Sequence, residues 1–152
     1  MLEGSIISAA RPAASAVLAA QALRYYDRRV TRLGFLGTGL IARYIYTFFH
    51  GTGWDIAEVI CADAQRTYAE QFAAMVCAAG QPDVTVYDRA EDVLRVCDVT
   101  VIATTAATPH IHTADVLAYN PLFLHISLRD LAPDLIEQAQ NIVDDVDHVL
   151  QA

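Results

Sequence analysis

The chain has 152 residues, of which 55% are hydrophobic, and it carries a formal net charge of −8 at pH 7. This length suits one domain with a sizeable core, and the acidic balance argues against a nucleic-acid partner, because phosphate binding needs a basic surface. No apolar run approaches the ~18 residues of a membrane span, and no basic segment opens the chain, so we expect neither a membrane span nor a signal peptide.

Helical and strand patterns alternate along the chain after an alanine-rich start. Residues 9–29 predict a helix, and Pro12 suits its first turn, which places Arg11 at the helix start. The strands are expected at about 31–36, 56–62, 83–87, 99–103, 122–126 and 141–143. The helices are expected at 40–50, 65–79, 91–96, 113–118 and 133–139. This alternation predicts an α/β fold, a doubly wound (Rossmann-type) parallel sheet of about six strands with an extra N-terminal helix.

A glycine-rich turn joins the first strand to the helix after it, at Gly37-Thr38-Gly39-Leu40-Ile41-Ala42. Gly37 permits a tight turn, and Gly39 lets backbone N–H groups approach a pyrophosphate. Ala42 holds the third place, where a small residue keeps the helix close to the strand. The pattern predicts a dinucleotide site, against the alternative of an ordinary β–α turn.

Asp63 closes the second strand. A carboxylate at this place accepts hydrogen bonds from the adenosine ribose and repels a 2′-phosphate, which favours NAD over NADP. A helix N-cap is the alternative role, and both roles can coexist. Arg66 follows closely and is interpreted as a solvated helix residue.

Polar residues also follow the fourth and fifth strands, at the edge where the carboxyl ends of parallel strands meet. Thr104 and Thr105 could reach a bound ribose or nicotinamide, or could serve only the turn. Ser127 and Asp130 follow the fifth strand. Asp130 could act as an acid or base or bind a substrate ammonium group, although its spacing alone favours a solvated or capping loop residue.

The sequence contains no pattern that predicts a metal site or a reactive thiol. Cys61, Cys77 and Cys97 lie in helix or strand patterns without metal-ligand spacing, so we expect buried, reduced thiols and a cytoplasmic location. The aspartates of residues 144–147 indicate a solvated acidic loop, and no metal is expected. The histidines have no partner at a diagnostic spacing, and those at positions 110 and 112 are the best placed.

Residues 2–15 resemble the segment ending in S-x-x-R-T-A-A of the ornithine cyclodeaminase/mu-crystallin family, where it also precedes an alanine-rich helix and the glycine turn. Residues 127–133 and 141–148 are most similar to one branch, the NAD-dependent dehydrogenases of 2,3-diaminopropionate biosynthesis. The resemblance covers nearly the whole chain but only the dinucleotide-binding part of a longer family protein. It implies that the substrate and dimerisation domain of a homodimeric parent lies outside residues 1–152. Because that domain carries a family lysine, we expect this fragment alone to be inactive.

The resemblance also implies cofactor roles for individual residues. Leu40 and Ile41 would present backbone N–H groups to the pyrophosphate, and Asp63 would bind the ribose. Thr104 corresponds to the threonine of the cofactor cleft, and Ser127 to the nicotinamide side.

Two further residues acquire catalytic roles from the resemblance. Arg11 would meet the cofactor and the substrate carboxylate, and Asp130 would bind the substrate amine and serve in proton transfer. The role of Asp130 thus reverses the interpretation from spacing alone. Pro12 departs from the family, which usually has threonine there.

The implied reaction is a hydride transfer from the amine-bearing Cα of an amino acid to NAD⁺. In the diaminopropionate branch the substrate is N-(2-amino-2-carboxyethyl)-L-glutamate, and water splits the imine into 2,3-diaminopropionate and 2-oxoglutarate. The leading hypothesis is such a dehydrogenase, supplying a siderophore or peptide natural product. The alternatives are an ornithine cyclodeaminase or ketimine reductase on the same scaffold, and a non-catalytic, mu-crystallin-like binding protein.

Overall fold

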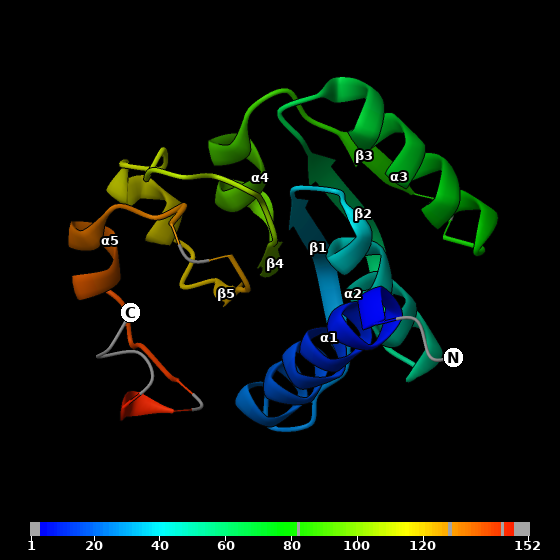
Figure 1. Cartoon of the computed structure of the whole chain (residues 1–152), viewed down its shortest axis with the longest axis horizontal. Helices are drawn as coiled ribbons and strands as arrows, with labels where there is room; N and C mark the ends of the chain where they lie inside the picture. Colours follow the sequence, from blue (N-terminus) through cyan, green and yellow to red (C-terminus); the bar gives the residue numbers. More distant parts are fainter. Residues whose placement is uncertain (1–3, 82, 128, 144, 148–152) are drawn as a thin grey trace.

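Five parallel strands form one sheet in the order β3-β2-β1-β4-β5 in the computed structural model, which describes residues 4–81, 83–127, 129–143 and 145–147 (Figure 1). The strands are β1 (Arg29–Leu36), β2 (Asp55–Ala62), β3 (Val84–Val86), β4 (Val99–Ile102) and β5 (Leu122–His125). The helices are α1 (Gly4–Leu23), α2 (Leu40–Gly51), α3 (Arg66–Ala78), α4 (Ala90–Val96), the 3-10 helix η1 (Ala114–Leu117) and α5 (Pro133–Glu137). The predicted α/β, doubly wound sheet is therefore confirmed.

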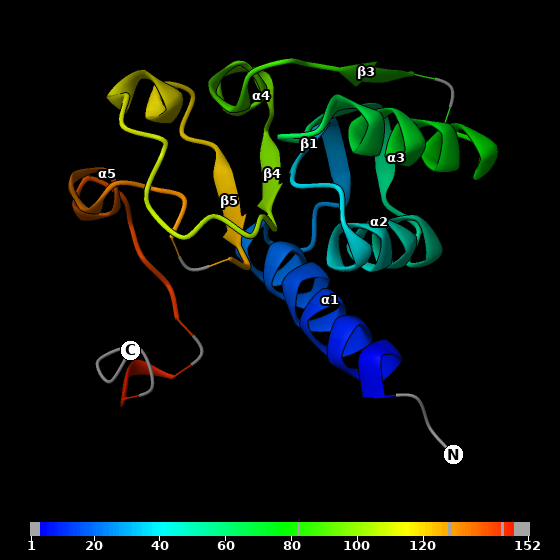
Figure 2. The ribbon, with the colours of Figure 1, turned by 45° about the horizontal axis from the view of Figure 1, so that its top comes forward.

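Helices cover both faces of the sheet, and the carboxyl halves of its two longest strands, β1 and β2, are accordingly buried (Figure 2). Successive side chains of a strand point to opposite faces. Phe35 of β1 packs into a core with α1, α2 and α3. Its neighbour Leu36 packs into a second core with α4, η1 and α5. The two layers hold the strands in a fixed register.

The carboxyl ends of four strands finish on one row of the sheet. Leu36 pairs with Ala62 on one side and with Ile102 on the other, and Ile102 pairs in turn with His125. The residues that follow these four positions therefore gather at a single edge. This is the edge where ligands bind in sheets of this topology.

The N-terminal helix differs from its prediction at both ends. Helix α1 begins at Gly4, so Pro12 lies inside the helix rather than in its first turn, and Arg11 does not mark the helix start. The buried stripe of this helix spans the proline, since it includes Ala9 before Pro12 and Ala13 and later alanines after it. Packing of this stripe outweighs the backbone hydrogen bond that a proline removes.

The sixth strand predicted at 141–143 is absent from the described part of the chain, where these residues are irregular. The side-chain amide of Asn141 donates hydrogen bonds to the backbone carbonyls of Ile136 (2.6 Å) and Ala139 (3.1 Å). These bonds fold the chain back on the end of α5, and Ile142 and Val143 are left exposed. The helix predicted at 113–118 is only the short η1.

The thiols fit the prediction in part. All three cysteines are free, and Cys61 and Cys97 are buried, but Cys77 is exposed on α3, which corrects the expectation that all are buried. Burial raises the pKa of both Cys61 and Cys97 to about 12. Neither buried thiol is therefore a nucleophile near neutral pH.

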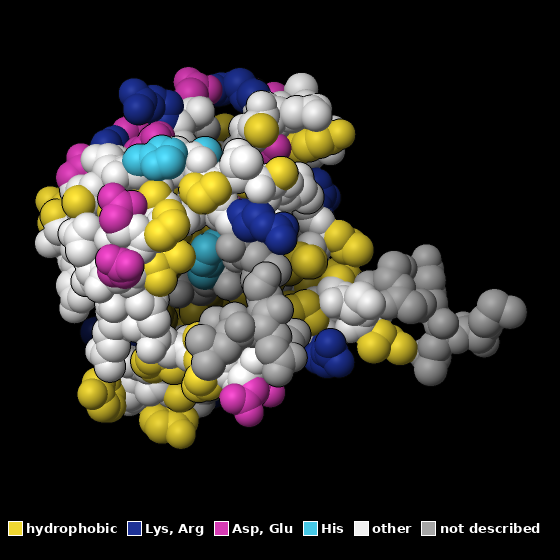
Figure 3. Space-filling model, turned by 60° about the vertical axis from the view of Figure 1, so that its left-hand side comes forward, with side chains coloured by type: hydrophobic (Ala, Val, Ile, Leu, Met, Phe, Trp, Pro, Cys, Tyr) yellow, Lys and Arg dark blue, Asp and Glu magenta, His cyan; other side chains and the backbone are white. Residues whose placement is uncertain are grey.

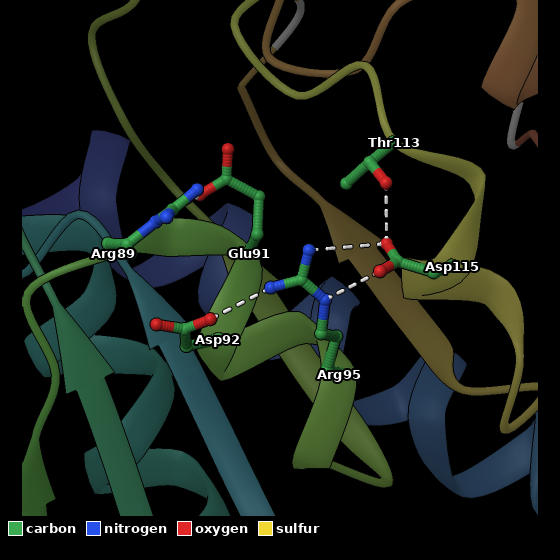
Figure 4. Close-up of polar contacts among 6 residues, drawn as sticks. All are labelled: Arg89, Glu91, Asp92, Arg95, Thr113 and Asp115. Carbon is green, nitrogen blue, oxygen red and sulfur yellow. Dashed lines mark hydrogen bonds and ion pairs between the residues drawn. The ribbon is translucent and has the colours of Figure 1, made fainter.

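A small ion-pair network joins α4 to η1 (Figure 4). The guanidinium of Arg95 donates to Asp92 (2.8 Å) and to Asp115 (2.9 Å), and the Thr113 hydroxyl donates to Asp115 (2.7 Å). The hydrogen bond from Thr113 and the one from Arg95 together hold the pKa of Asp115 below its ordinary value. The network is exposed, so it orients the loop more than it stabilises the fold.

Several large apolar side chains remain exposed, including Leu18 on α1 and Ile142 and Val146 near the C-terminus. Hydrophobic side chains are visible on the face that carries the C-terminal part of the chain (Figure 3). Within the described residues, none of the helices combines the length and apolar character needed to cross a bilayer.

Candidate functional site

The glycine turn after β1 needs its two glycines for different reasons. Gly37 has φ +76°, and a Cβ added there would stand 2.5 Å from the carbonyl oxygen of Ala103. Only glycine fits such a conformation and such a close approach to the end of β4. A Cβ added to Gly39, by contrast, would meet nothing within 4 Å. The space beside Gly39 is open, as a cradle for a ligand would be.

Helix α2 begins at this open space without a cap. Gly39 is its N-cap residue and supplies no side-chain hydrogen bond, and the first turn contains no acidic residue. The backbone N–H groups of Leu40 and Ile41 have no acceptor within the helix. These donors and the positive end of the helix dipole favour an anion such as a phosphate.

Asp63 is bonded directly to the glycine turn. Its Oδ2 accepts two hydrogen bonds from Thr38, one from the backbone N–H and one from the hydroxyl, both at 2.8 Å. Its Oδ1 accepts a bond from the backbone N–H of Gln65 (3.0 Å). Gln65, rather than Asp63, is the N-cap residue of α3, so the alternative role as an N-cap is wrong in its strict form. A carboxylate has about four acceptor positions, so Oδ1 can still accept a ligand hydroxyl.

Asp130 is fully buried, with a relative exposure of 0%, and lies where the ends of β4 and β5 meet. Its carboxylate accepts hydrogen bonds from the hydroxyls of Thr104 and Ser127. The ring Nε2 of His125 lies 3.2 Å from its Oδ2. Asp130 is thus neither solvated nor a simple cap, which corrects the interpretation from spacing.

The charge of Asp130 is stabilised by these three partners. Burial alone raises the pKa of the carboxyl, but the hydrogen bonds from Ser127, Thr104 and His125 outweigh burial and hold the pKa below its ordinary value. The His125 side chain is 22% exposed and connects the buried charge toward solvent. The cluster can therefore hold a negative charge at the carboxyl edge of the sheet without exposing it.

Thr38 and His125 belong to the site but were not predicted from the sequence as site residues. Thr38 is 1% exposed and fixes Asp63, and a hydroxyl residue between two turn glycines was the available signal. His125 is the last residue of β5, five positions before Asp130. A histidine at the carboxyl end of a strand was the signal there, whereas the favoured His110 and His112 have exposed side chains.

Most of the predicted site residues gather at the same edge, but not all of them do. Arg11 is exposed on α1, and its side chain makes no hydrogen bond or ion pair with other described residues. Thr105 is exposed, unlike the half-buried Thr104. In the described part of the chain no three His, Cys, Asp or Glu side chains form a group that could hold a metal ion. Asp144 of the acidic loop lies outside the described residues.

Most of this chain is similar in sequence to one known protein family. The sequence profile of the ornithine cyclodeaminase/mu-crystallin family matches residues 1–122. The chain belongs to the ornithine cyclodeaminase/mu-crystallin family. No sequence among the curated proteins matches closely enough to count as a relative.

Solved structures similar to this ornithine cyclodeaminase/mu-crystallin family chain include dehydrogenases and reductases. CmnK is 25% identical with a TM-score of 0.82, over 98% of this chain and 44% of CmnK. Δ1-Pyrroline-2-carboxylate reductase of Thermococcus litoralis, in complex with NADH and L-proline, is 25% identical with a TM-score of 0.59, over 72% of this chain and 33% of the reductase. An archaeal alanine dehydrogenase dimer with bound NAD is 26% identical with a TM-score of 0.60, over 71% of this chain and 32% of the dehydrogenase chain. The chain thus spans less than half the length of these proteins.

Proposed function

We propose that this chain is the NAD-binding part of an NAD-dependent amino-acid dehydrogenase. The observation that carries the proposal is the open cradle at Gly39, beside the uncapped start of α2. An anion fits this cradle, and a ribose hydroxyl fits the free acceptor position of Asp63 next to it. The two features together suit the pyrophosphate and adenosine ribose of one dinucleotide.

Two similar proteins support NAD as that dinucleotide. The Thermococcus litoralis reductase holds NADH and L-proline, and the archaeal alanine dehydrogenase holds NAD. The charge of Asp63 supports the same choice, because a carboxylate beside the ribose repels the 2′-phosphate of NADP.

We propose that residues at the carboxyl edge of the sheet hold the cofactor. Leu40 and Ile41 would donate backbone N–H groups to the pyrophosphate, and Asp63 would accept from the ribose. Thr104 and Ser127 lie at the ends of β4 and β5, where they would line the nicotinamide side. When bound, the nicotinamide would supply a hydride acceptor.

The catalytic assignments rest on Arg11 and Asp130. Arg11 is exposed and free to bind a substrate carboxylate with its guanidinium fork. Asp130 is enclosed, so we propose that it acts on the substrate amine and its proton through the groups bonded to it, His125 and Ser127, rather than by direct contact. Its fixed negative charge would favour an ammonium group at the mouth of the cleft.

For the substrate we propose N-(2-amino-2-carboxyethyl)-L-glutamate, oxidised and then split by water into 2,3-diaminopropionate and 2-oxoglutarate, in siderophore or peptide natural-product biosynthesis. The support is the resemblance of residues 127–133 and 141–148 to that branch. The substrate domain and the contacts of a homodimer would lie in a longer protein that carries this chain. Free thiols support a reducing, cytoplasmic setting.

Isothermal titration calorimetry of this chain with NAD⁺ and NADP⁺ tests the cofactor. We expect NAD⁺ to bind more tightly, and Asp63→Ala to weaken NAD⁺ binding roughly tenfold or more, as for a lost hydrogen bond to a charged group. Asp55→Ala is the matched control, because Asp55 begins β2 at the opposite edge of the sheet. Equal or tighter binding of NADP⁺ would contradict the proposal.

The reaction is tested with the longer protein, NAD⁺ and the glutamate adduct, by following the absorbance of NADH and the release of 2-oxoglutarate. Formation of both products supports the dehydrogenase. Proline formed from ornithine without NADH would assign the protein to the cyclodeaminases instead.

A further inference from the structure

Two arginines lie at the carboxyl edge of the sheet near Asp63, and acidic side chains hold both of them. Arg66, the first residue of α3, donates from Nε to Glu70 (3.0 Å) and from a terminal nitrogen to Asp88. Arg89 follows Asp88 in sequence and lies 3.7 Å from the carboxylate of Glu91 (Figure 4). Both guanidinium groups are thus paired with carboxylates, Arg66 by two hydrogen bonds and Arg89 by a longer ion pair.

The register of the sheet places Asp88 beside Asp63. Cys61 of β2 pairs with Val86 of β3, and the backbone N–H of Tyr87 donates to the Cys61 carbonyl (2.8 Å). Asp63 and Asp88 each follow this pair by two residues, in the loops after these neighbouring strands. Arg66 begins α3, three residues after Asp63, and bonds to the second of these carboxylates.

Because Arg66 lies close to Asp63 in sequence, its pairing with Asp88 bears on whether a 2′-phosphorylated dinucleotide can bind. A free guanidinium just beyond Asp63 would offer a fork of donors to a phosphate on the ribose 2′ position. With Glu70 and Asp88 bonded to it, two carboxylates offset one positive charge, and two of its donor nitrogens are occupied. The Arg66 guanidinium, which is the group best placed to bind a 2′-phosphate, is thus bonded to carboxylates instead.

We propose that Asp88 is a positioning residue for cofactor selectivity, which disfavours 2′-phosphorylated dinucleotides by holding Arg66. The inference rests on the proposed NAD binding of this edge and goes beyond the direct repulsion by Asp63. Asp88 and Arg66 are both more than half exposed, so each stays accessible to a ligand and to solvent. The effect on binding is accordingly modest, of the size of a surface ion pair.

The experiment measures the Kd of NAD⁺ and of NADP⁺ by calorimetry for the chain and for Asp88→Asn, each also in an Asp63→Asn background where direct repulsion is removed. We expect Asp88→Asn to tighten NADP⁺ binding roughly three- to fivefold and to change NAD⁺ binding less than about twofold. Asp83→Asn is the control, because it removes the same charge just before β3, at the opposite edge, and should change neither constant.

The same substitution in an Arg66→Gln background shows whether the effect passes through Arg66. The gain for NADP⁺ should then vanish, because no guanidinium is left to release. If Asp88→Asn still tightens NADP⁺ binding without Arg66, the inference is overturned. It is also overturned if Asp88→Asn fails to tighten NADP⁺ binding both with Asp63 and in the Asp63→Asn background. If wild-type chain binds no NAD⁺ at all, the proposed function itself fails, which is a separate and recognisable result.

Discussion

The hydroxyl and the backbone N–H of Thr38 both donate to the same carboxylate oxygen of Asp63, each over 2.8 Å. This pair joins the glycine turn after β1 to the end of β2. The turn and the ribose-binding acid are therefore one structural unit, and a change at either residue should be felt at the other.

Thr38→Val tests this unit. Valine has nearly the same shape but no hydroxyl, so Asp63 should lose one of its two bonds from residue 38 while the buried packing stays. We expect the free energy of unfolding to fall by about 1–2 kcal/mol and NAD⁺ affinity to fall with it. Denaturant unfolding and calorimetry measure the two effects. Thr38→Ser keeps the hydroxyl, and a loss as large as that of valine would show that the hydrogen bond is not the cause.

Alanine substitution should affect ligand binding at Gly39 and folding stability at Gly37. Gly39→Ala adds a Cβ to open space, so we expect an unfolding free energy within about 0.5 kcal/mol of wild type but NAD⁺ binding weakened more than about tenfold. Gly37→Ala forces a side chain into a positive φ and against the Ala103 carbonyl, and should cost about 3 kcal/mol of stability. Unimpaired NAD⁺ binding by a stable Gly39→Ala variant would argue against the cradle.

Asp130 should make the free energy of unfolding depend on pH in the acidic range. Its pKa in the folded protein lies below the ordinary value, so the stability it contributes is complete above the unfolded pKa of about 3.9. That contribution is lost as the pH falls through the folded pKa. We therefore expect Asp130→Asn to lower the free energy of unfolding by about 1–3 kcal/mol at pH 7. The difference from wild type should shrink below about pH 4.

Unfolding curves in denaturant between pH 3 and pH 8 would check this. Asp134→Asn, at an exposed position early in α5, is the control and should keep the acid dependence of wild type. A difference between Asp130→Asn and wild type that stays constant into acid would mean that the carboxylate charge is not what the cluster stabilises.

The sequence predicted the sheet and the glycine turn well, because strands buried on both faces and a turn with fixed glycines leave local patterns. The ribose-binding role of Asp63 stays a prediction. The sequence placed Pro12 wrongly because a proline usually marks the first turn of a helix, whereas α1 begins earlier, at Gly4, and continues through the proline. It added a strand at 141–143 because short apolar runs read alike whether or not a neighbouring strand is there to pair with them.

The Asp130 cluster was harder to predict for a different reason. Thr104 and Asp130 are far apart in sequence and meet only because β4 and β5 are neighbours in register. Spacing along the chain carries no signal of such a meeting, so Asp130 resembled a solvated loop residue. His125 joined the cluster unnoticed for the same reason.

The close approach of Gly37 to Ala103 also bears on how this edge can move. The turn after β1 is packed against the end of β4 and joined through Thr38 to the end of β2, so the three loops are linked to one another. A ligand would meet a preorganised platform and would lose little affinity to ordering the protein around it. Any opening or closing of a cleft above this edge would therefore move the platform as a rigid body.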